Sequence, residues 1–505
     1  MEPERIPKNE ELRKTVSIPQ LVAIAFLLVS GGPFGQEEAI QAGGAKLTFI
    51  ATICIPLLYS FPLSLLSSEQ ATRMPACGGA IEWGTILGKY PSWFNSYTRF
   101  VRSVVDNALY PSMVCNYLKE LIPQLDKIQW RILTVLLSNI FSLVCNYTGL
   151  DTVGWVSIVL FILIISPFVL FFIFATNKMT PSAVFADYPP ESGKPNIAQL
   201  ISTIIWQCSG FDTVAALSKE VRNPRVTFPI SMLITVFLVI LVYLLPTIAG
   251  ICTEPDPQKW GDTTFASISL KLPHCSSGWL EKWISFAGVC SSLSLLNVAL
   301  SCTGRELYAS GRIGAFPFSS YLGRLTNNCK KEPTPMIGII VMSVLTIPLS
   351  LIDFSSLLQL TGITTVLAQL IQVVVLIFAR YPKINCAKKN LQILESQNQP
   401  SMTDELLSQQ PNYSSSQYLT SEFSESKNHD KFIIPGGIFS LLGVCIPLVG
   451  VSVFLLAISN WTDIVYSFSA IVAFFVLRGI SLFFEWSIKK CKDSKQNKIG
   501  MKQIE

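Results

Sequence analysis

Charged residues are scarce in this sequence. Only 14% of its 505 residues are Asp, Glu, Lys or Arg, whereas 50% are hydrophobic. A soluble protein of this length would carry nearly twice that charged fraction. The composition therefore excludes an ordinary soluble fold and indicates a chain that lies mostly in lipid.

Histidine and the usual catalytic or metal-binding motifs are missing as well. The two histidines, His274 and His429, lie in predicted loops, and the 13 cysteines show no CxxC spacing. HExxH, GxSxG and P-loop patterns do not occur. We therefore expect no enzyme and no cofactor, and the net charge of +5 gives no hint of nucleic acid. Cys252 and Cys275 bracket one predicted outside loop, where a disulfide and two free thiols are equally consistent with the sequence.

Long hydrophobic runs are abundant. About twelve runs of 18 or more residues are each long enough to cross roughly 30 Å of hydrocarbon. A charged N-terminal segment precedes a first run of full span length, so we expect no cleavable signal peptide. The sequence predicts an all-α polytopic membrane protein whose runs cover 18–44, 47–70, 94–119, 129–148, 152–175, 197–218, 228–251, 283–304, 335–353, 355–379, 432–458 and 462–486.

Lys and Arg are distributed unevenly among the connections between these runs. If the N-terminus is cytoplasmic, about 26 of the 38 basic residues fall in inside segments and about 9 in outside segments. We therefore expect both termini in the cytoplasm, with Lys219, Arg222, Arg225 and the loop 305–331 on the same side. The plasma membrane is the expected location.

Composition also divides the chain into five segments. A core of ten spans is flanked by a short charged tail and followed by a polar loop rich in Ser, Gln and Asn, which is predicted to be disordered. The expected boundaries are 1–17 for the N-terminal tail, 18–380 for the core, 381–431 for the loop, 432–487 for the last two spans and 488–505 for the C-terminal tail.

Helix-breaking residues interrupt the first and the sixth run. SGGPFG occupies 30–35, and Ser209-Gly210 precedes Asp212 in the other run. Glycine costs about 1 kcal/mol and proline about 3 kcal/mol in a helix interior. Unwound backbone at membrane depth is tolerated only where it lines a cavity or is buried in protein. Two such interruptions five runs apart indicate the central site of a transporter. We predict that 30–35 and 208–212 are non-helical and face each other, and we favour this over a merely kinked packing helix.

Away from the ends of the runs lie four carboxylates, which need partners because a central Asp costs roughly 2.5–3.5 kcal/mol in a membrane. No Lys or Arg lies deep in the first, sixth, eighth or tenth run, so we expect a negative cavity that suits a cationic substrate, a proton or both. For Asp106, an ion pair with Arg102 one turn away and a substrate role are equally open. Glu38 is expected to cap the helix after the first break. Glu37 and Asp212 are favoured as functional groups.

The sequence leaves two coupling ions open. The runs contain no histidine, so carboxylates would have to carry protons. Sodium is not excluded, because Ser291, Ser292 and Ser294 of the eighth run could supply oxygen ligands together with backbone of the first run.

Five motifs occur in a fixed order along 18–380: SGGPFGQEEAIQAGG, RMPACGGAIEW, VVDNALYPSMVCNYL, NYTGLDTVGW and GFDTVAALSKEVRNPRVTFP. Together they resemble the amino acid–polyamine–organocation transporters, and within them the plant and protozoan polyamine and L-type amino acid permeases. The resemblance implies a LeuT-type fold of 12 transmembrane helices, with 5+5 inverted repeats, discontinuous helices 1 and 6, and alternating access. It also favours protons over sodium as the coupling ion.

The resemblance also implies roles for individual residues. Trp206 matches a gating aromatic, and Phe34 is a weaker candidate of the same kind. Glu37 and Asp212 match acidic positions of the polyamine branch, whereas Gly210-Phe211 departs from the two aromatics usual in plant polyamine carriers. The expected substrate-binding residues are Ser30, Gly31, Gly32, Phe34, Glu37, Asp106, Trp206, Cys208, Ser209, Gly210, Phe211 and Asp212.

The function expected from these observations is secondary active transport of polyamines, amino acids or both, by proton symport. An amino acid exchanger or symporter without polyamine activity is one alternative, and a nutrient sensor built on a transporter fold is another. The implied partners are a small-molecule substrate and the lipid bilayer, and no protein partner follows from the sequence.

Overall fold

The computed structural model describes residues 12–185, 194–261, 263–327, 329, 332–352, 354–381, 432–435, 437–458 and 464–482. The predicted loop 381–431, apart from Tyr381, and the predicted tail 488–505 lie outside the described residues. Within the described part the chain is almost entirely helical. The one ladder pairs β1 (Thr326–Asn327) antiparallel with β2 (Pro333–Thr334).

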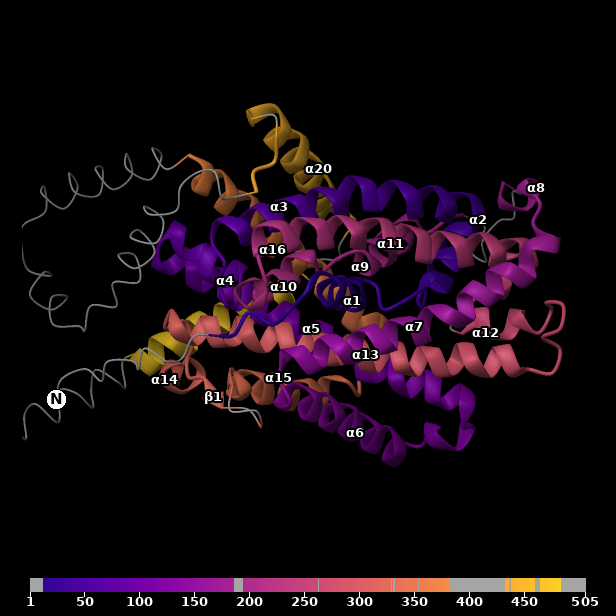
Figure 1. Ribbon diagram of the computed structural model, residues 1–505, viewed down its shortest axis with the longest axis horizontal. Coiled ribbons are helices and arrows are strands. Elements are labelled where there is room, and N and C mark those ends of the chain that lie inside the picture. Colours follow the sequence, from indigo (N-terminus) through magenta and orange to yellow (C-terminus); the bar gives the residue numbers. More distant parts are fainter. Residues whose placement is uncertain are drawn as a thin grey trace, which may run out of the picture.

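Long helices form the body of the molecule (Figure 1). They are α1 (Ile18–Val29), α2 (Gln36–Ile55), α3 (Phe61–Arg73), α5 (Lys89–Leu121), α6 (Ile128–Tyr147), α7 (Leu150–Ala175), α9 (Ile197–Gln207), α11 (Pro224–Thr253), α13 (Trp279–Arg312), α15 (Met336–Leu349), α16 (Phe354–Arg380) and α20 (Gly437–Ile458). A further helix covers Ile464–Leu482.

Short helices connect or extend the long ones. They are α4 (Ala80–Trp83), α8 (Pro181–Val184), α10 (Phe211–Val214), α12 (Thr264–Ser269) and α14 (Ser319–Leu322), with π-helical η1 (Pro56–Ser60) and 3₁₀ segments η2 (Gly84–Leu87), η3 (Pro123–Asp126), η4 (Thr176–Lys178), η5 (Ala215–Glu220) and η6 (Pro257–Lys259).

Nine helices among the described residues are long and apolar enough to cross a membrane. The predicted count of twelve is therefore met only in part. The helices at 18–29 and 336–349 are apolar but shorter, and α5 is not among the nine. The first two predicted runs meet without a loop, because α2 turns at Gly44, whose φ of 73° lies outside the helical region. Glycine adopts this conformation without the steric penalty of a side chain.

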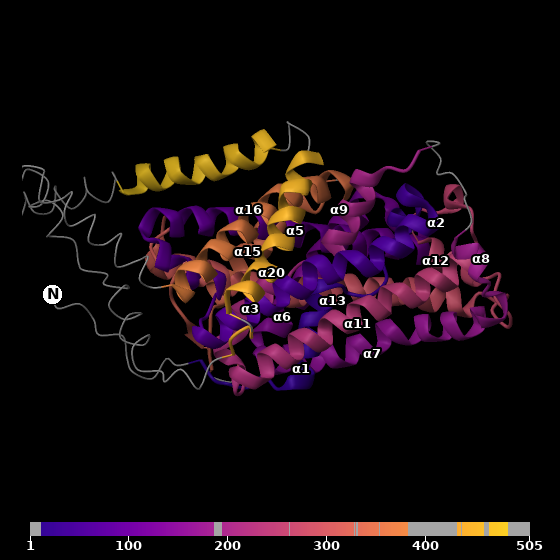
Figure 2. The ribbon, with the colours of Figure 1, turned by 90° about the horizontal axis from the view of Figure 1, so that it is seen from above.

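The helices differ widely in how much of their surface lies inside the bundle. The apolar window of α13 is 89% buried, whereas that of the helix Ile464–Leu482 is 17% buried, and Figure 2 shows this last helix at the edge of the bundle. α5 carries Arg99, Arg102 and Asp106 near its middle and packs against α13 and α16. Charged side chains at this depth are tolerated because neighbouring helices shield them from lipid.

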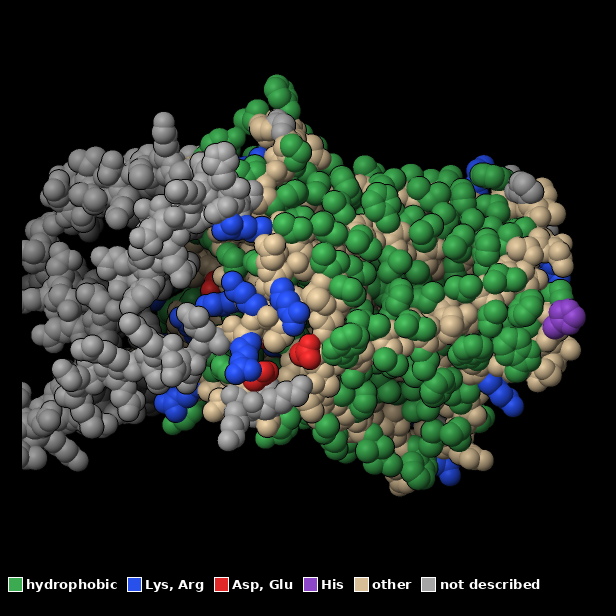
Figure 3. All heavy atoms as spheres, viewed as in Figure 1, with side chains coloured by type: hydrophobic (Ala, Val, Ile, Leu, Met, Phe, Trp, Pro, Cys, Tyr) green, Lys and Arg blue, Asp and Glu red, His purple; other side chains and the backbone are tan. Residues whose placement is uncertain are grey.

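The connections gather at two opposite ends (Figure 1). At one end, Val16 forms a β-bridge with Val221, and Arg13 lies 3.1 Å from Glu332. The N-terminal segment therefore lies beside the connection after α10 and beside the connection before α15, as the charge distribution predicts. Figure 3 shows Lys and Arg concentrated towards this end, whereas hydrophobic side chains cover the middle of that face. The cytoplasmic orientation of this end stays a prediction.

The cysteines of the described residues are free thiols. Cys252 lies close to the Thr180 carbonyl, whereas Cys275 is buried. Of the two alternatives for this loop, the structure therefore has the two free thiols.

Candidate functional site

The first predicted break is present. α1 ends at Val29 and α2 begins at Gln36, so 30–35 is non-helical as predicted. Gly31, Gly32 and Gly35 have φ values of 66°, 116° and 85°, which L side chains rarely adopt. The glycines therefore allow the chain to leave the helix and re-enter it within six residues.

Most of the backbone groups that this break frees are bonded within the protein. The N–H groups of Ser30 and Gly31 donate to the Phe26 carbonyl, at 2.8 and 3.1 Å. The Gly32 N–H donates to Ser30 Oγ at 3.2 Å. The Ser30 carbonyl accepts a hydrogen bond from the Tyr243 hydroxyl at 3.2 Å. The first three N–H donors of this loop are thus already occupied.

The second break is narrower than predicted. α9 ends at Gln207 and α10 begins at Phe211, so only 208–210 is non-helical; the expectation for Phe211 and Asp212 was wrong. Gly210 has a φ of 108°, and a Cβ built on it would lie 3.4 Å from the Leu28 carbonyl oxygen. Glycine there permits α10 to restart immediately and the second break to approach the end of α1.

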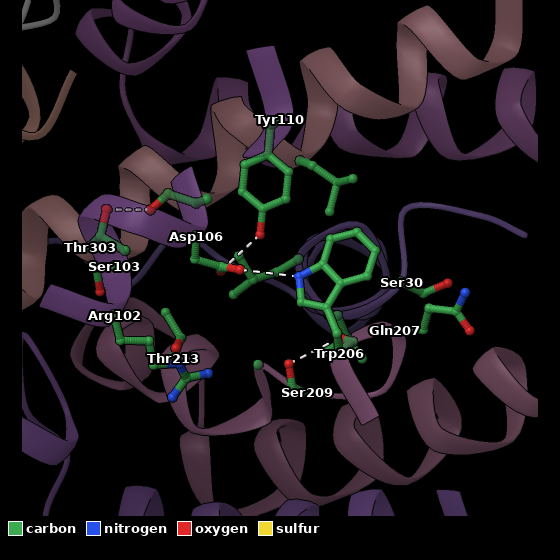
Figure 4. A pocket seen from close by; sticks show the side chains of 15 residues that line it. Ser30, Arg102, Ser103, Asp106, Tyr110, Trp206, Gln207, Ser209, Thr213 and Thr303 are labelled. Carbon is green, nitrogen blue, oxygen red and sulfur yellow. Dashed lines mark hydrogen bonds between the residues drawn. The ribbon is translucent and has the colours of Figure 1, made fainter. Parts of the chain in front are cut away.

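The two breaks meet at a small cavity of about 20 Å³ (Figure 4). α5 and α13 complete its wall. Five of the expected site residues line it: Ser30, Asp106, Trp206, Ser209 and Gly210. Its other lining residues are Leu28, Val29, Arg102, Ser103, Tyr110, Gln207, Thr213, Leu295, Ala299 and Thr303.

Asp106 is the carboxylate that reaches this cavity. Its Oδ2 accepts a hydrogen bond from the Tyr110 hydroxyl at 2.9 Å, and its Oδ1 accepts one from the Trp206 indole N–H at 3.2 Å. Figure 4 shows all three side chains converging from α5 and α9. Both donors are uncharged, so neither hydrogen bond neutralises a carboxylate at this position.

Asp212, in contrast, does not line the cavity. Its Oδ2 lies 2.9 Å from Arg99 Nη1 and 2.7 Å from Arg102 Nη1, and its side chain is fully buried. Arg102 therefore forms its ion pair with Asp212; of the two alternatives left open for Asp106, the ion pair with Arg102 one turn away is not formed among the described residues. The expectation of a cavity without internal cations was wrong, because Arg102 of α5 lines it.

The ion pairs continue into the neighbouring helices. Arg99 Nη1 also lies 3.2 Å from Glu306 Oε1, and its Nη2 donates to Gln372 Oε1 at 3.3 Å. We call Arg99, Arg102, Asp212 and Glu306 the ion-pair cluster. Arg99 and Glu306 were not among the predicted site residues. Glu306 lay outside the predicted eighth run, which ended at 304, whereas α13 continues to Arg312. The arginines three residues apart on one face of α5 were the available signal.

Glu37, which was expected to be a functional group, bonds the freed backbone after the first break. Its Oε2 accepts a hydrogen bond from the Gly35 N–H at 3.0 Å. Phe34 packs edge-on against Tyr117 and Phe168, with ring centroids 5.0 and 5.2 Å apart, and does not line the cavity. The remaining expected site residues that do not line it are Gly31, Gly32, Glu37, Cys208, Phe211 and Asp212.

The candidate sodium ligands of the eighth run also have partners. The Ser291 hydroxyl donates to the Gly31 carbonyl, and the Ser294 hydroxyl donates to the Ser291 carbonyl at 2.7 Å. The Ser292 hydroxyl donates to the Gly288 carbonyl at 2.9 Å. The Ser291 bond joins α13 to the first break and stabilises its unwound conformation, whereas the other two bonds lie within α13.

Two interrupted helices that border one buried polar cavity are typical of a membrane transporter. The family model for amino acid permeases matches residues 20–390, so the chain belongs to the amino acid permease family, within the amino acid–polyamine–organocation superfamily. It is an integral, multi-pass membrane protein.

Relatives carry names of two kinds. A probable polyamine transporter of Arabidopsis thaliana is 28% identical over 70% of this chain and 69% of its own length. Polyamine transporter PUT1 of Oryza sativa subsp. japonica is 28% identical over 74% of this chain and 69% of its own length. The branched-chain amino acid permease BcaP of Lactococcus lactis is 23% identical over 66% of this chain and 74% of its own length.

Proposed function

We propose that this protein is a secondary transporter that takes up polyamines, with one substrate ammonium bound at Asp106. The observation that carries this proposal is the bonding of Asp106, which borders the cavity and accepts hydrogen bonds from two uncharged donors. An ammonium group is the natural further partner, because a charge-assisted hydrogen bond is roughly twice as strong as a hydrogen bond between neutral groups.

The charges around the cavity favour a cation. The ion-pair cluster contains two guanidinium groups and two carboxylates, so its formal charges cancel. Asp106 then adds one negative charge to a water-excluded space, where a single ion pair is worth more than in bulk water. An ammonium or a proton at Asp106 neutralises the site.

The hydrogen bonds of the first break favour a polyamine over an amino acid. An amino acid would require backbone N–H donors for its carboxylate, and those of Ser30, Gly31 and Gly32 already have acceptors. A polyamine has no carboxylate and needs only acceptors. Several relatives are named polyamine transporters, which supports the same choice.

We further propose proton symport by alternating access, on a LeuT-type fold with inverted repeats and cytoplasmic termini in the plasma membrane. The two breaks five predicted spans apart, which border one cavity, support this arrangement. Asp106 can bind either a proton or a substrate ammonium, so this one carboxylate would couple proton movement to polyamine movement. Sodium coupling is the alternative, and uptake under imposed proton or sodium gradients distinguishes it from proton coupling.

The test is uptake of labelled putrescine by purified protein in liposomes, under imposed proton or sodium gradients. We expect accumulation driven by an inward proton gradient. Asp106→Asn should raise the KM for putrescine roughly ten- to hundredfold, because a charge-assisted bond contributes about 1.5–3 kcal/mol. Glu120→Gln, at an exposed position of the same helix, is the control and should behave as wild type. Transport of neutral amino acids without putrescine would refute the proposal.

A further inference from the structure

Gln207 is a buried polar side chain of the cavity wall that has no hydrogen-bond partner. Within the described residues, neither its Nε2 nor its Oε1 is bonded, although the residue is only 2% exposed. It is the last residue of α9 and lines the cavity directly before the second break. Gln207 was not among the predicted site residues.

An unbonded buried amide is unfavourable in a folded protein. Most buried polar side-chain atoms have at least one partner, and each exception requires an explanation. Leaving a donor or acceptor unpaired costs its full desolvation, which would favour an apolar residue at this position. An amide on the wall of a substrate cavity is explained if the substrate is its partner.

Gln207 and Asp106 lie in different parts of the cavity wall. A Cβ built on Gly35 would lie 3.4 Å from Gln207 Nε2 and 3.6 Å from Trp206 Cζ3, so the amide lies against the first break. In the view of Figure 4, Gln207 and Asp106 lie on opposite sides of the Trp206 indole. The cavity thus has an anionic region at Asp106 and an uncharged amide region beside the first break.

We propose that the amide oxygen of Gln207 accepts a hydrogen bond from the second amino group of a polyamine whose first ammonium is at Asp106. This inference rests on the proposed function and specifies its substrate class. A monoamine fills only the Asp106 region and leaves Gln207 unbonded. Gln207 therefore selects diamines and longer polyamines over monoamines.

The experiment compares putrescine with n-butylamine, which has the same four-carbon chain and a single amino group. In Gln207→Leu, the KM for putrescine should rise about tenfold, since one substrate hydrogen bond is lost. The inhibition constant of n-butylamine against putrescine uptake should stay within about twofold of the wild-type value. Equal losses for both amines would show that the substitution damages the cavity generally and would overturn the proposal.

Gln207→Glu tests the direction of the hydrogen bond with an almost identical shape. If the amide oxygen faces an ammonium, an added negative charge should lower the KM for putrescine. An unchanged or raised KM in this variant would overturn the proposal.

Thr203→Val is the matched control. Thr203 lies one turn earlier on α9, is 2% exposed and has an unbonded hydroxyl, but it does not line the cavity. Its replacement should leave the putrescine KM unchanged. Wild-type protein that accumulates no putrescine would refute the proposed function itself. Wild-type uptake together with an unchanged KM in Gln207→Leu would refute the role of Gln207 alone.

Discussion

Replacing Asp212 by Asn tests whether this carboxylate holds the helices together or binds substrate. Asp212 is fully buried and pairs with Arg99 and Arg102, whose side chains are 1% and 6% exposed. The substitution keeps the shape of the side chain and removes one of two carboxylates in the ion-pair cluster. One guanidinium charge is then left without compensation inside the protein.

The expected loss is large because the remaining charge stays buried. Removing one partner of a buried ion pair costs about 3–5 kcal/mol, compared with a total stability of about 5–15 kcal/mol for a typical domain. The control is Glu254→Gln, because Glu254 pairs with Lys259 and Lys271, which are 62% and 49% exposed. Pairs with such exposed partners contribute about 1 kcal/mol or less.

The assay is thermal unfolding of the purified protein in detergent, together with the putrescine KM of the folded fraction. Asp212→Asn should unfold at a much lower temperature than Glu254→Gln. Adding Arg102→Gln to Asp212→Asn removes the unpaired charge, while Arg99 keeps its contact of 3.2 Å with Glu306, so the double variant should recover much of the stability. Wild-type stability combined with a strongly raised KM would refute this reasoning and identify Asp212 as a substrate ligand.

Three further outcomes are expected. Trp206→Phe should raise the putrescine KM roughly two- to tenfold at normal surface expression, because it removes the indole hydrogen bond to Asp106. Trp206→Leu should raise the KM further, because it also removes an aromatic face that would attract a substrate ammonium. An unchanged KM in both variants would exclude a gating role. Gly31→Ala should reduce folded yield in size-exclusion chromatography, because its Cβ would lie 2.6 Å from Leu295 Cδ1 at a φ of 66°; a wild-type yield would contradict this steric argument. In protein without native cysteines, an impermeant thiol reagent outside intact cells should label a cysteine at Ser276 but not one at Asn223; the reverse pattern would overturn the predicted orientation.

The helices and their interruptions could be predicted from sequence because they depend on neighbouring residues. The runs predicted at 129–148 and 152–175 correspond to α6 at 128–147 and α7 at 150–175. Glycine and proline likewise act within their own turn of chain, so the break at 30–35 was predicted with its boundaries. The second break was predicted two residues too long, because an Asp after glycine is also compatible with a helix start.

The partners of the charged groups could not be predicted in the same way. Arg99 and Asp212 are 113 residues apart in the chain, and Gln372 joins the same network from a further helix. The nearest charged neighbour of Asp106 in the sequence is Arg102, yet packing directs Arg102 to Asp212. Sequence distance is a poor guide here, because long side chains inside a bundle bond to whichever helix faces them.

The sequence by itself therefore determined that this chain crosses the membrane repeatedly and is interrupted twice, since hydrophobicity and helix propensity are local properties. It also determined the family, because the five ordered motifs lie within the residues that match the amino acid permease model. Only the tertiary structure decided which carboxylate reaches the cavity, which is compensated by arginine and which buried amide is left without a partner. Those distinctions depend on the relative rotation of packed helices, and that rotation results from contacts between segments far apart in the chain.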